Sequence, residues 1–331
     1  MPWRACPAVY LALLAWSLLA GALARPPVAA AQTAGPPHRI GVVVFVPMTA
    51  GVQEGFRQGF REHGYAEGQN LVVEWRSAEG SVARANAVAE ELVRLKSDVI
   101  MAEFTPSIRA ARSATQTIPI VMVSAGDPVG TGLVESLSRP GGNVTGLSNA
   151  AVELSGKRID LLREVRPGLA RVGMLVQGSD PLEKSVIEET RRAAASTGMQ
   201  LHVATVPQAD ALTGAFAALL KERVGALVVL ANLPVPPQRV AELAVRHRLP
   251  SIAITEQFVN AGGLISYGAN PTDIRRRAVG YVDRILKGAR PADLPVERPT
   301  IFELVVNRKA ARALGLQVPQ SMLLRADRVI D

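Results

Sequence analysis

Short apolar runs alternate with longer amphipathic stretches along almost the whole chain, and this alternation constrains the fold more than any other feature. The apolar runs have the length of strands, whereas the longer stretches place apolar residues on one helical stripe, as Val52, Phe56 and Phe60 show. Strands that alternate with helices form parallel sheets, because a parallel neighbour is reached through a crossover connection. The pattern therefore predicts an α/β fold with helices on both faces of each sheet.

The alternating series occurs twice, with a division near residues 147–152. The first series predicts strands at 40–45, 71–75, 99–102, 118–124 and 144–147. The second predicts strands at 171–176, 201–206, 226–230, 251–254, 264–267 and 301–306. One helix is expected to run from Thr105 as N-cap, with Pro106 at its first position, to about residue 116. A length of 331 residues fits about two domains, so the prediction is two α/β lobes.

Residues 1–31 differ from the rest of the chain. Arg4 gives a basic start, residues 8–24 are apolar, and small residues at 22–24 and 29–31 offer cleavage sites. This layout predicts a secretory signal peptide, cleaved after Ala24 or Ala31. The alternative is an uncleaved membrane anchor, because the apolar run nearly reaches the roughly 20 residues that a span needs. Cys6 is the single cysteine, so the chain has no intrachain disulfide and no cysteine-based zinc site.

The formal net charge of +8 raises the question of a nucleic-acid partner. The arginines are dispersed rather than gathered in a stripe, and an exported protein does not meet nucleic acid. The densest basic cluster, at residues 275–277, is interpreted as the solvated face of a helix. We therefore expect no nucleic-acid partner.

Signatures of common enzyme classes are missing from the sequence. It contains no G-x-G-x-x-G, no phosphate-binding G-x-x-x-x-G-K-[ST] and no G-x-S-x-G. The four histidines are scattered, and none follows a predicted strand, so neither a hydrolytic triad nor a histidine-based metal site is indicated. We expect no catalytic residue, no metal site and no cofactor.

The loops that follow the predicted strands carry the candidate ligand-binding residues, because open parallel sheets bind ligands beyond the carboxyl ends of their strands. These residues are Met48, Thr49, Glu103, Phe104, Thr105, Ser107, Ser124, Asp127, Gln177, Ser179, Asp180, Asn232, Gln257, Phe258 and Tyr267.

Each chemical type in this set predicts a role. Hydroxyls at a helix N-terminus, such as Thr105, would hold an anion, and Asp127 or Glu103 would accept an ammonium group. The aromatic residues would form apolar walls. Asp127 is equally interpreted as a turn residue, and Phe258 and Tyr267 as lobe core.

The sequence resembles the solute-binding proteins of ABC transporters, in the group that includes tryptophan and tyrosine uptake proteins. The resemblance covers residues 39–331. It is carried by FRQGF (56–60), GYAEGQN (64–70), TIPIV (117–121), GDPV (126–129), LSRPGGNVTG (137–146), KRIDLL (157–162), GGLISYG (262–268) and FELVVN (302–307).

The resemblance implies a type I periplasmic-binding fold, in which two Rossmann-like lobes are joined by crossing strands and close on a ligand. It places lobe 1 at 39–147 plus 268–297 and lobe 2 at 148–267 plus 298–331, with crossings near residues 148, 268 and 298. It also implies a periplasmic protein without catalysis that delivers its ligand to an inner-membrane ABC permease and its ATPase.

We therefore expect a monomer that binds a small polar or amphipathic solute, such as an amino acid or a related compound. Two alternatives stay open. One is a periplasmic sensory module for a receptor kinase or chemoreceptor, and the other is an exported α/β enzyme.

Two loops depart from the family pattern. Asn232-Leu233-Pro234 stands where relatives often have Asp-Pro and an aromatic residue, and Val46-Pro47-Met48 replaces a loop usually rich in Asn, Ser and Gly. These changes remove expected ammonium acceptors and leave Glu103 as the substitute. The resemblance therefore does not extend to an aromatic amino acid as the ligand.

Overall fold

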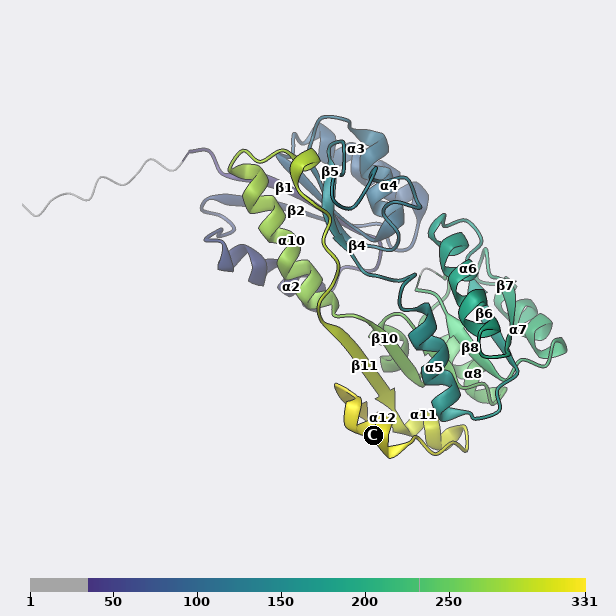
Figure 1. Cartoon of the computed structure of the whole chain (residues 1–331). Helices are drawn as coiled ribbons and strands as arrows, with labels where there is room; N and C mark the ends of the chain where they lie inside the picture. The colour runs from purple at the N-terminus through teal and green to yellow at the C-terminus, as the bar shows by residue number, and fades with distance from the viewer. Residues whose placement is uncertain (1–34, 232) are drawn as a thin grey trace, which may run out of the picture. The chain divides into compact units, whose positions relative to one another are not determined.

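A computed structural model describes residues 35–231 and 233–331. The expected signal peptide at 1–31 and the candidate Asn232 lie outside the described residues. The described chain forms two α/β lobes, each built on its own sheet (Figure 1).

Lobe 1 contains a five-stranded parallel sheet in the order β2-β1-β3-β4-β5. Its strands are β1 (His38–Val44), β2 (Leu71–Ser77), β3 (Val99–Glu103), β4 (Ile120–Ala125) and β5 (Val144–Ser148). Its helices are α2 (Ala50–Glu62), α3 (Val82–Arg94), α4 (Phe104–Ala114) and α10 (Pro271–Leu286), with the short 3-10 helix η2 (Pro291–Asp293).

Alternating side chains place helices on both faces of this sheet. Ile40 and Val42 of β1 share a core with Phe56 of α2 and Ile274 of α10, whereas Val43 points to the core beneath α3 and α4. Thr49 caps α2, because its Oγ1 accepts a hydrogen bond from Val52 N at 3.3 Å.

Lobe 2 contains a seven-stranded sheet in the order β12-β11-β10-β9-β8-β6-β7. Its strands are β6 (Arg171–Val176), β7 (Gln200–Thr205), β8 (Ala226–Val229), β9 (Ser251–Ala253), β10 (Ile265–Ala269), β11 (Phe302–Asn307) and β12 (Arg328–Ile330). Its helices are α5 (Ser155–Val165), α6 (Leu182–Ala195), α7 (Ala211–Lys221), α8 (Pro237–Arg246), α9 (Glu256–Asn260), α11 (Arg308–Ala313) and α12 (Gln320–Arg325). One face packs beneath α5 and α6 and the other beneath α7, α8 and α9.

The described chain passes between the lobes at three places. It leaves lobe 1 after β5, returns from β10 to α10 through Asn270, and leaves again at residues 298–301 to form β11. The first and third passages run side by side, because Ser148 N donates to Glu297 O at 2.9 Å. Arg158 joins the first to the second, since its Nη1 donates to Ala151 O (2.8 Å) and its Nε to Tyr267 O (3.0 Å).

The two-lobed α/β prediction is confirmed, with local differences. β11 runs antiparallel to β10 rather than parallel, because the chain enters β11 on its return from lobe 1. The helix expected to start after Thr105 begins at Phe104, so the prediction of Thr105 as its N-cap is wrong. Thr105 Oγ1 instead accepts a hydrogen bond from Gly126 N at 3.4 Å.

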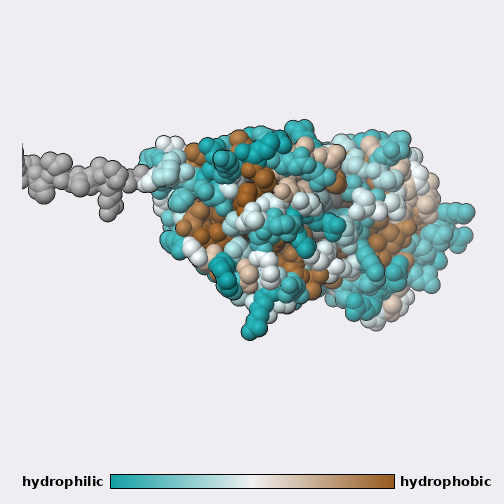
Figure 2. Space-filling model, turned by 90° about the horizontal axis from the view of Figure 1, so that it is seen from above, coloured by the Kyte–Doolittle hydropathy of each residue, from teal (hydrophilic) through white to brown (hydrophobic). Residues whose placement is uncertain are grey.

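Hydrophobic residues reach the surface in separate patches among hydrophilic ones on the face shown in Figure 2. Large hydrophobic residues that are exposed include Val82, Val129, Ile301 and Leu324. Within residues 35–231 and 233–331, no helix combines the length and the apolar character that crossing a membrane requires.

Gly59 lets α2 approach α10 closely, and its replacement is expected to destabilise lobe 1. A Cβ atom at Gly59 would lie 2.6 Å from Arg276 O and 2.8 Å from Val279 Cγ2. Gly59→Ala should therefore lower the free energy of unfolding by about 1–3 kcal/mol in urea titrations. Gly51→Ala on the same helix is the matched control, because a Cβ there approaches only Thr49 Oγ1, at 4.0 Å. It should leave stability equal or raise it by up to about 1 kcal/mol, and equal losses in both variants would contradict the packing argument.

Candidate ligand-binding site

Three cavities meet at Phe104, which follows β3 and lines all of them. The largest, which we call the apolar cavity, has a volume of about 310 Å³. Two neighbours of about 30 Å³ each are called the polar cavity and the third cavity. All three are lined by residues of both lobes.

The apolar cavity is formed by the loop after β1, by Phe104, and by the ends of β8 and β9 with the segments that follow them. Its lining residues are Val46, Pro47, Thr49, Val52, Phe104, Val229, Leu230, Ala231, Leu233, Val235, Pro237, Val240, Ala253, Thr255, Gln257 and Phe258. Among these described residues none has an ionisable side chain. Thr49, Thr255 and Gln257 supply the polar side-chain groups.

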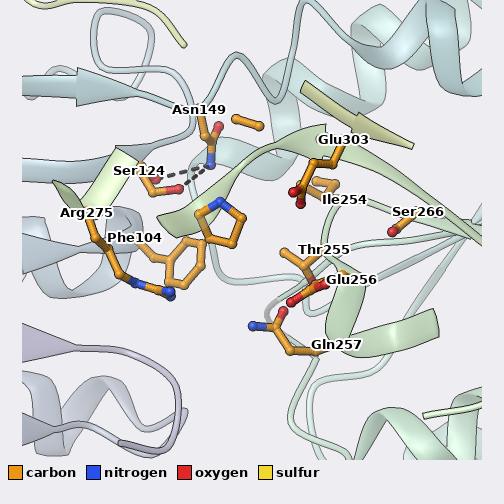
Figure 3. Close-up of a pocket in the computed structure, with 13 residues that line it drawn as sticks. Phe104, Ser124, Asn149, Ile254, Thr255, Glu256, Gln257, Ser266, Arg275 and Glu303 are labelled. Carbon is orange, nitrogen blue, oxygen red and sulfur yellow. Dashed lines mark hydrogen bonds between the residues drawn. The ribbon is translucent and has the colours of Figure 1, made fainter. Parts of the chain in front are cut away.

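Figure 3 shows the polar cavity. It adjoins the apolar cavity at Phe104, Thr255 and Gln257, which line both. Asn149, at the start of the first passage between the lobes, binds Ser124 of lobe 1: its Nδ2 donates to Ser124 O (3.1 Å) and to Ser124 Oγ (3.2 Å). The other lining residues are Ile254, Glu256, Ser266, Gly268, Ala269, Pro271, Arg275 and Glu303.

The carboxylates of the polar cavity have partners within the chain. Glu256 Oε2 accepts from Arg328 Nη2 at 2.6 Å, and Glu303 Oε1 accepts from Asn270 Nδ2 at 2.5 Å. Burial raises the pKa of the Glu303 carboxyl above its ordinary value, although the hydrogen bond from Asn270 opposes that rise.

A buried ion pair between Glu103 and Arg275 joins the N-terminus of α4 to α10. The side chains are 1% and 4% exposed, and Nε and Nη2 of Arg275 both donate to Glu103 Oε1, at 3.0 and 2.8 Å. Burial raises the pKa of Glu103, and the guanidinium of Arg275 opposes this rise. Glu103 does not line any of the three cavities, so it would have to leave Arg275 to accept a ligand ammonium group.

Three of the seven described non-glycine residues with positive φ lie at or beside these cavities. Phe104 has a φ of 65°, Ser124 of 68° and Ala150 of 54°. The first two residues line the polar cavity, and Ala150 lies between Asn149 and Ala151, which line the third. Such conformations cost about 1–3 kcal/mol each and cluster at ligand-binding sites.

The third cavity lies beside the loop after β6. Glu183 binds this loop, because its carboxylate accepts from Gln177 N (2.6 Å) and Gly178 N (2.7 Å). Asp180 Oδ1 accepts from Leu182 N at 3.0 Å. Leu182 contacts lobe 1 so closely that a Cβ on Gly126 would lie 2.2 Å from its Cδ2.

The structure places some of the predicted site residues together at the cavities and others apart. Thr49, Phe104, Ser124, Asp180, Gln257 and Phe258 line at least one of the three. The residues that line none of them are Met48, Glu103, Thr105, Ser107, Asp127, Gln177, Ser179 and Tyr267.

Several of the residues away from the cavities have structural contacts instead. Asp127 Oδ1 accepts from Gly130 N at 2.9 Å, as a turn residue does. Tyr267 stacks on Phe302, with ring centroids 6.3 Å apart.

Sequence reasoning missed Asn149, Glu256, Arg275 and Glu303. The interpretation of Arg275 as part of a solvated face is wrong, because its side chain is buried. Its position three and four residues before Ala278 and Val279, which belong to the lobe 1 core, was the available signal. Glu303 had no such signal, because the sequence of a strand does not show whether one of its carboxylates lines a cavity or lies on the outer surface.

Two α/β lobes with one ligand-sized cavity lined by residues of both are typical of two-lobed binding proteins. The family model of the ABC transporter substrate binding protein matches residues 39–330, and the chain belongs to this family. Its members bind small molecules for ABC transporters and are not enzymes. Within the part of the chain that the structure describes, no group of three or more His, Cys, Asp or Glu is placed to hold a metal ion.

Similar proteins agree with this assignment. A tyrosine-binding protein of Clostridioides difficile strain R20291 is 27% identical over 267 residues, which are 80% of this chain and 76% of that protein. The crystal structure of a conserved domain protein from Vibrio cholerae is 29% identical, with a TM-score of 0.81 over 88% of this chain and 99% of that one. An ABC domain from Streptococcus pneumonia in complex with L-Trp is 27% identical, with a TM-score of 0.80 over 89% and 100%.

Proposed function

We propose that this protein is the exported solute-binding component of an ABC importer, and that it captures a small polar or amphipathic solute between its lobes. The apolar cavity carries this proposal, because residues of both lobes form its walls. A solute held there would contact both lobes at once and would favour the arrangement in which they meet. The names of the similar proteins point to amino acids or related compounds as the solute class.

We propose residues 39–147 plus 268–297 as lobe 1 and 148–267 plus 298–331 as lobe 2, with the three passages as the hinge. Two observations support this division. The strands β5 and β10 end at Ser148 and Ala269, and the hydrogen bonds of Arg158 hold the first two passages together. Hinges of this kind absorb rotation in a few residues between rigid lobes.

The proposal places the mature protein in the periplasm as a monomer that delivers its solute to an inner-membrane permease and its ATPase. The support for export is the layout of residues 1–31, with a basic start, an apolar run and small-residue cleavage sites. The support for the transporter partner is the family itself.

A thermal-shift screen of the purified mature protein tests the proposal. The screen uses a library of amino acids, organic acids, amines and neutral aromatic compounds. A solute present at a hundredfold excess over its Kd should stabilise the protein by about 3 kcal/mol, because it binds only the folded state. A library in which no compound raises the melting temperature would contradict the solute-binding function.

A further inference from the structure

None of the described side chains that line the apolar cavity carries a charge that could complement a charged ligand. Its described lining residues are aliphatic residues, prolines and two phenylalanines, apart from the side chains of Thr49, Thr255 and Gln257. Hydroxyl and amide groups can each exchange a hydrogen bond with a neutral polar group. They do not neutralise an ammonium or a carboxylate that has been removed from water.

Charged side chains do occur in the two neighbouring cavities, but each is engaged within the chain. Arg275 pairs with Glu103, Glu256 with Arg328, and Glu303 with Asn270. In the third cavity, Glu183 accepts two backbone N–H groups and Asp180 accepts one. These cavities are also small, at about 30 Å³ each against about 310 Å³ for the apolar cavity. A charged head group that reached these cavities would therefore have to compete with contacts that the chain already makes.

We infer that the apolar cavity takes a small neutral molecule, with an apolar body and one or two hydrogen-bonding groups, in preference to a zwitterionic amino acid. This inference rests on the proposed function and narrows its solute class. A volume of about 310 Å³ lies at the lower end of the range for ligand pockets, so the solute is of the size of a single ring with a short chain. Its polar group lies at Thr255 and Gln257, where the apolar cavity meets the polar one.

A series of four compounds with the same phenyl body tests the inference by calorimetric titration at neutral pH. Phenylpropanol is neutral, phenylpropanoate is an anion, phenylpropylamine is a cation and L-phenylalanine is a zwitterion. Phenylpropanol should bind at least about tenfold more tightly than L-phenylalanine, because each charged group buried without a partner weakens binding. The two singly charged compounds should also bind more weakly than the alcohol.

The variant Gln257→Glu places a carboxylate at the cavity without changing the size of the side chain. Gln257 is exposed, so the variant should fold. It should bind phenylpropylamine about fivefold more tightly than the unaltered protein, and it should bind phenylpropanol no more tightly, because a carboxylate attracts the cation but cannot donate a hydrogen bond to the alcohol. The matched control is Gln69→Glu, which makes the same charge change at an exposed loop residue that lines none of the three cavities. It should alter neither affinity.

The outcomes separate this inference from the proposed function. The inference is overturned if L-phenylalanine or either singly charged compound binds as tightly as phenylpropanol, or if phenylpropanol does not bind. It is also overturned if Gln257→Glu leaves the affinity for phenylpropylamine unchanged. If the inference is overturned but the thermal-shift screen finds a charged solute, the proposed solute-binding function still stands. If the screen finds no solute at all, the proposed function is contradicted as well.

Discussion

Arg275→Met is expected to lower the free energy of unfolding by about 3–5 kcal/mol, the largest loss of stability that any single substitution discussed here should cause. The variant keeps the bulk of the side chain but removes the cation from Glu103, which is 1% exposed. Glu103 Oε2 already lacks a hydrogen-bond partner among the described atoms. Without Arg275 the whole carboxylate is buried and unpaired, or it must take up a proton. The melting temperature in calorimetry should fall by about 10 °C.

Two further variants identify the cause of this loss. Arg276→Met, on the same helix, removes a guanidinium that is 36% exposed and pairs with Glu62 and Asp273. It should cost no more than about 1 kcal/mol. The double variant Glu103→Leu with Arg275→Met removes both buried charges and should recover most of the stability lost in Arg275→Met. A loss below about 1 kcal/mol in Arg275→Met, or no recovery in the double variant, would contradict the role assigned to the pair.

Phe104→Ala is expected to weaken the binding of phenylpropanol by about tenfold to hundredfold. The ring of Phe104 lines all three cavities and is the lobe 1 aromatic wall of the apolar one, and buried aromatic contacts carry much of the energy of such sites. Phe302→Ala is the control, because Phe302 is a half-buried aromatic residue that stacks on Tyr267 and lines none of the three cavities. In calorimetric titration, the affinity of Phe302→Ala for phenylpropanol should be within about twofold of that of the unaltered protein.

Phe104→Gly separates the role of the ring from that of the backbone. It removes the same ring as Phe104→Ala, but glycine adopts the φ of 65° at this position without strain. The glycine variant should bind phenylpropanol as weakly as the alanine variant and should be more stable than it by about 1 kcal/mol in urea titrations. A Phe104→Ala variant with unchanged affinity would contradict the placement of the ligand beside Phe104.

The fold could be predicted from the sequence because its signals are local and repeated. The strand at 171–176 was predicted at the residues where β6 lies, and the helical stripe of Val52, Phe56 and Phe60 packs in the lobe 1 core. The direction of β11 could not be predicted, because it depends on where the chain returns from the other lobe. Helix α9 was missed, since five residues are too few to show a helical period.

The candidate site could be predicted only in part. Loops after strands were the right regions, and Phe104, Gln257 and Phe258 line the apolar cavity. The pairing of Glu103 with Arg275, 172 residues further along the chain, leaves no trace in local sequence. Glu103 was therefore interpreted as a ligand contact and Arg275 as a solvated residue, although each satisfies the other inside lobe 1.

The most direct test of the account is a crystal structure of the protein with the tightest-binding solute from the thermal-shift screen. The account predicts one chemically intact molecule in the apolar cavity, in contact with Phe104 of lobe 1 and Phe258 of lobe 2. A solute bound to the outside of one lobe, or density for a reaction product in its place, would contradict the claim that this protein holds a small molecule between its lobes without altering it.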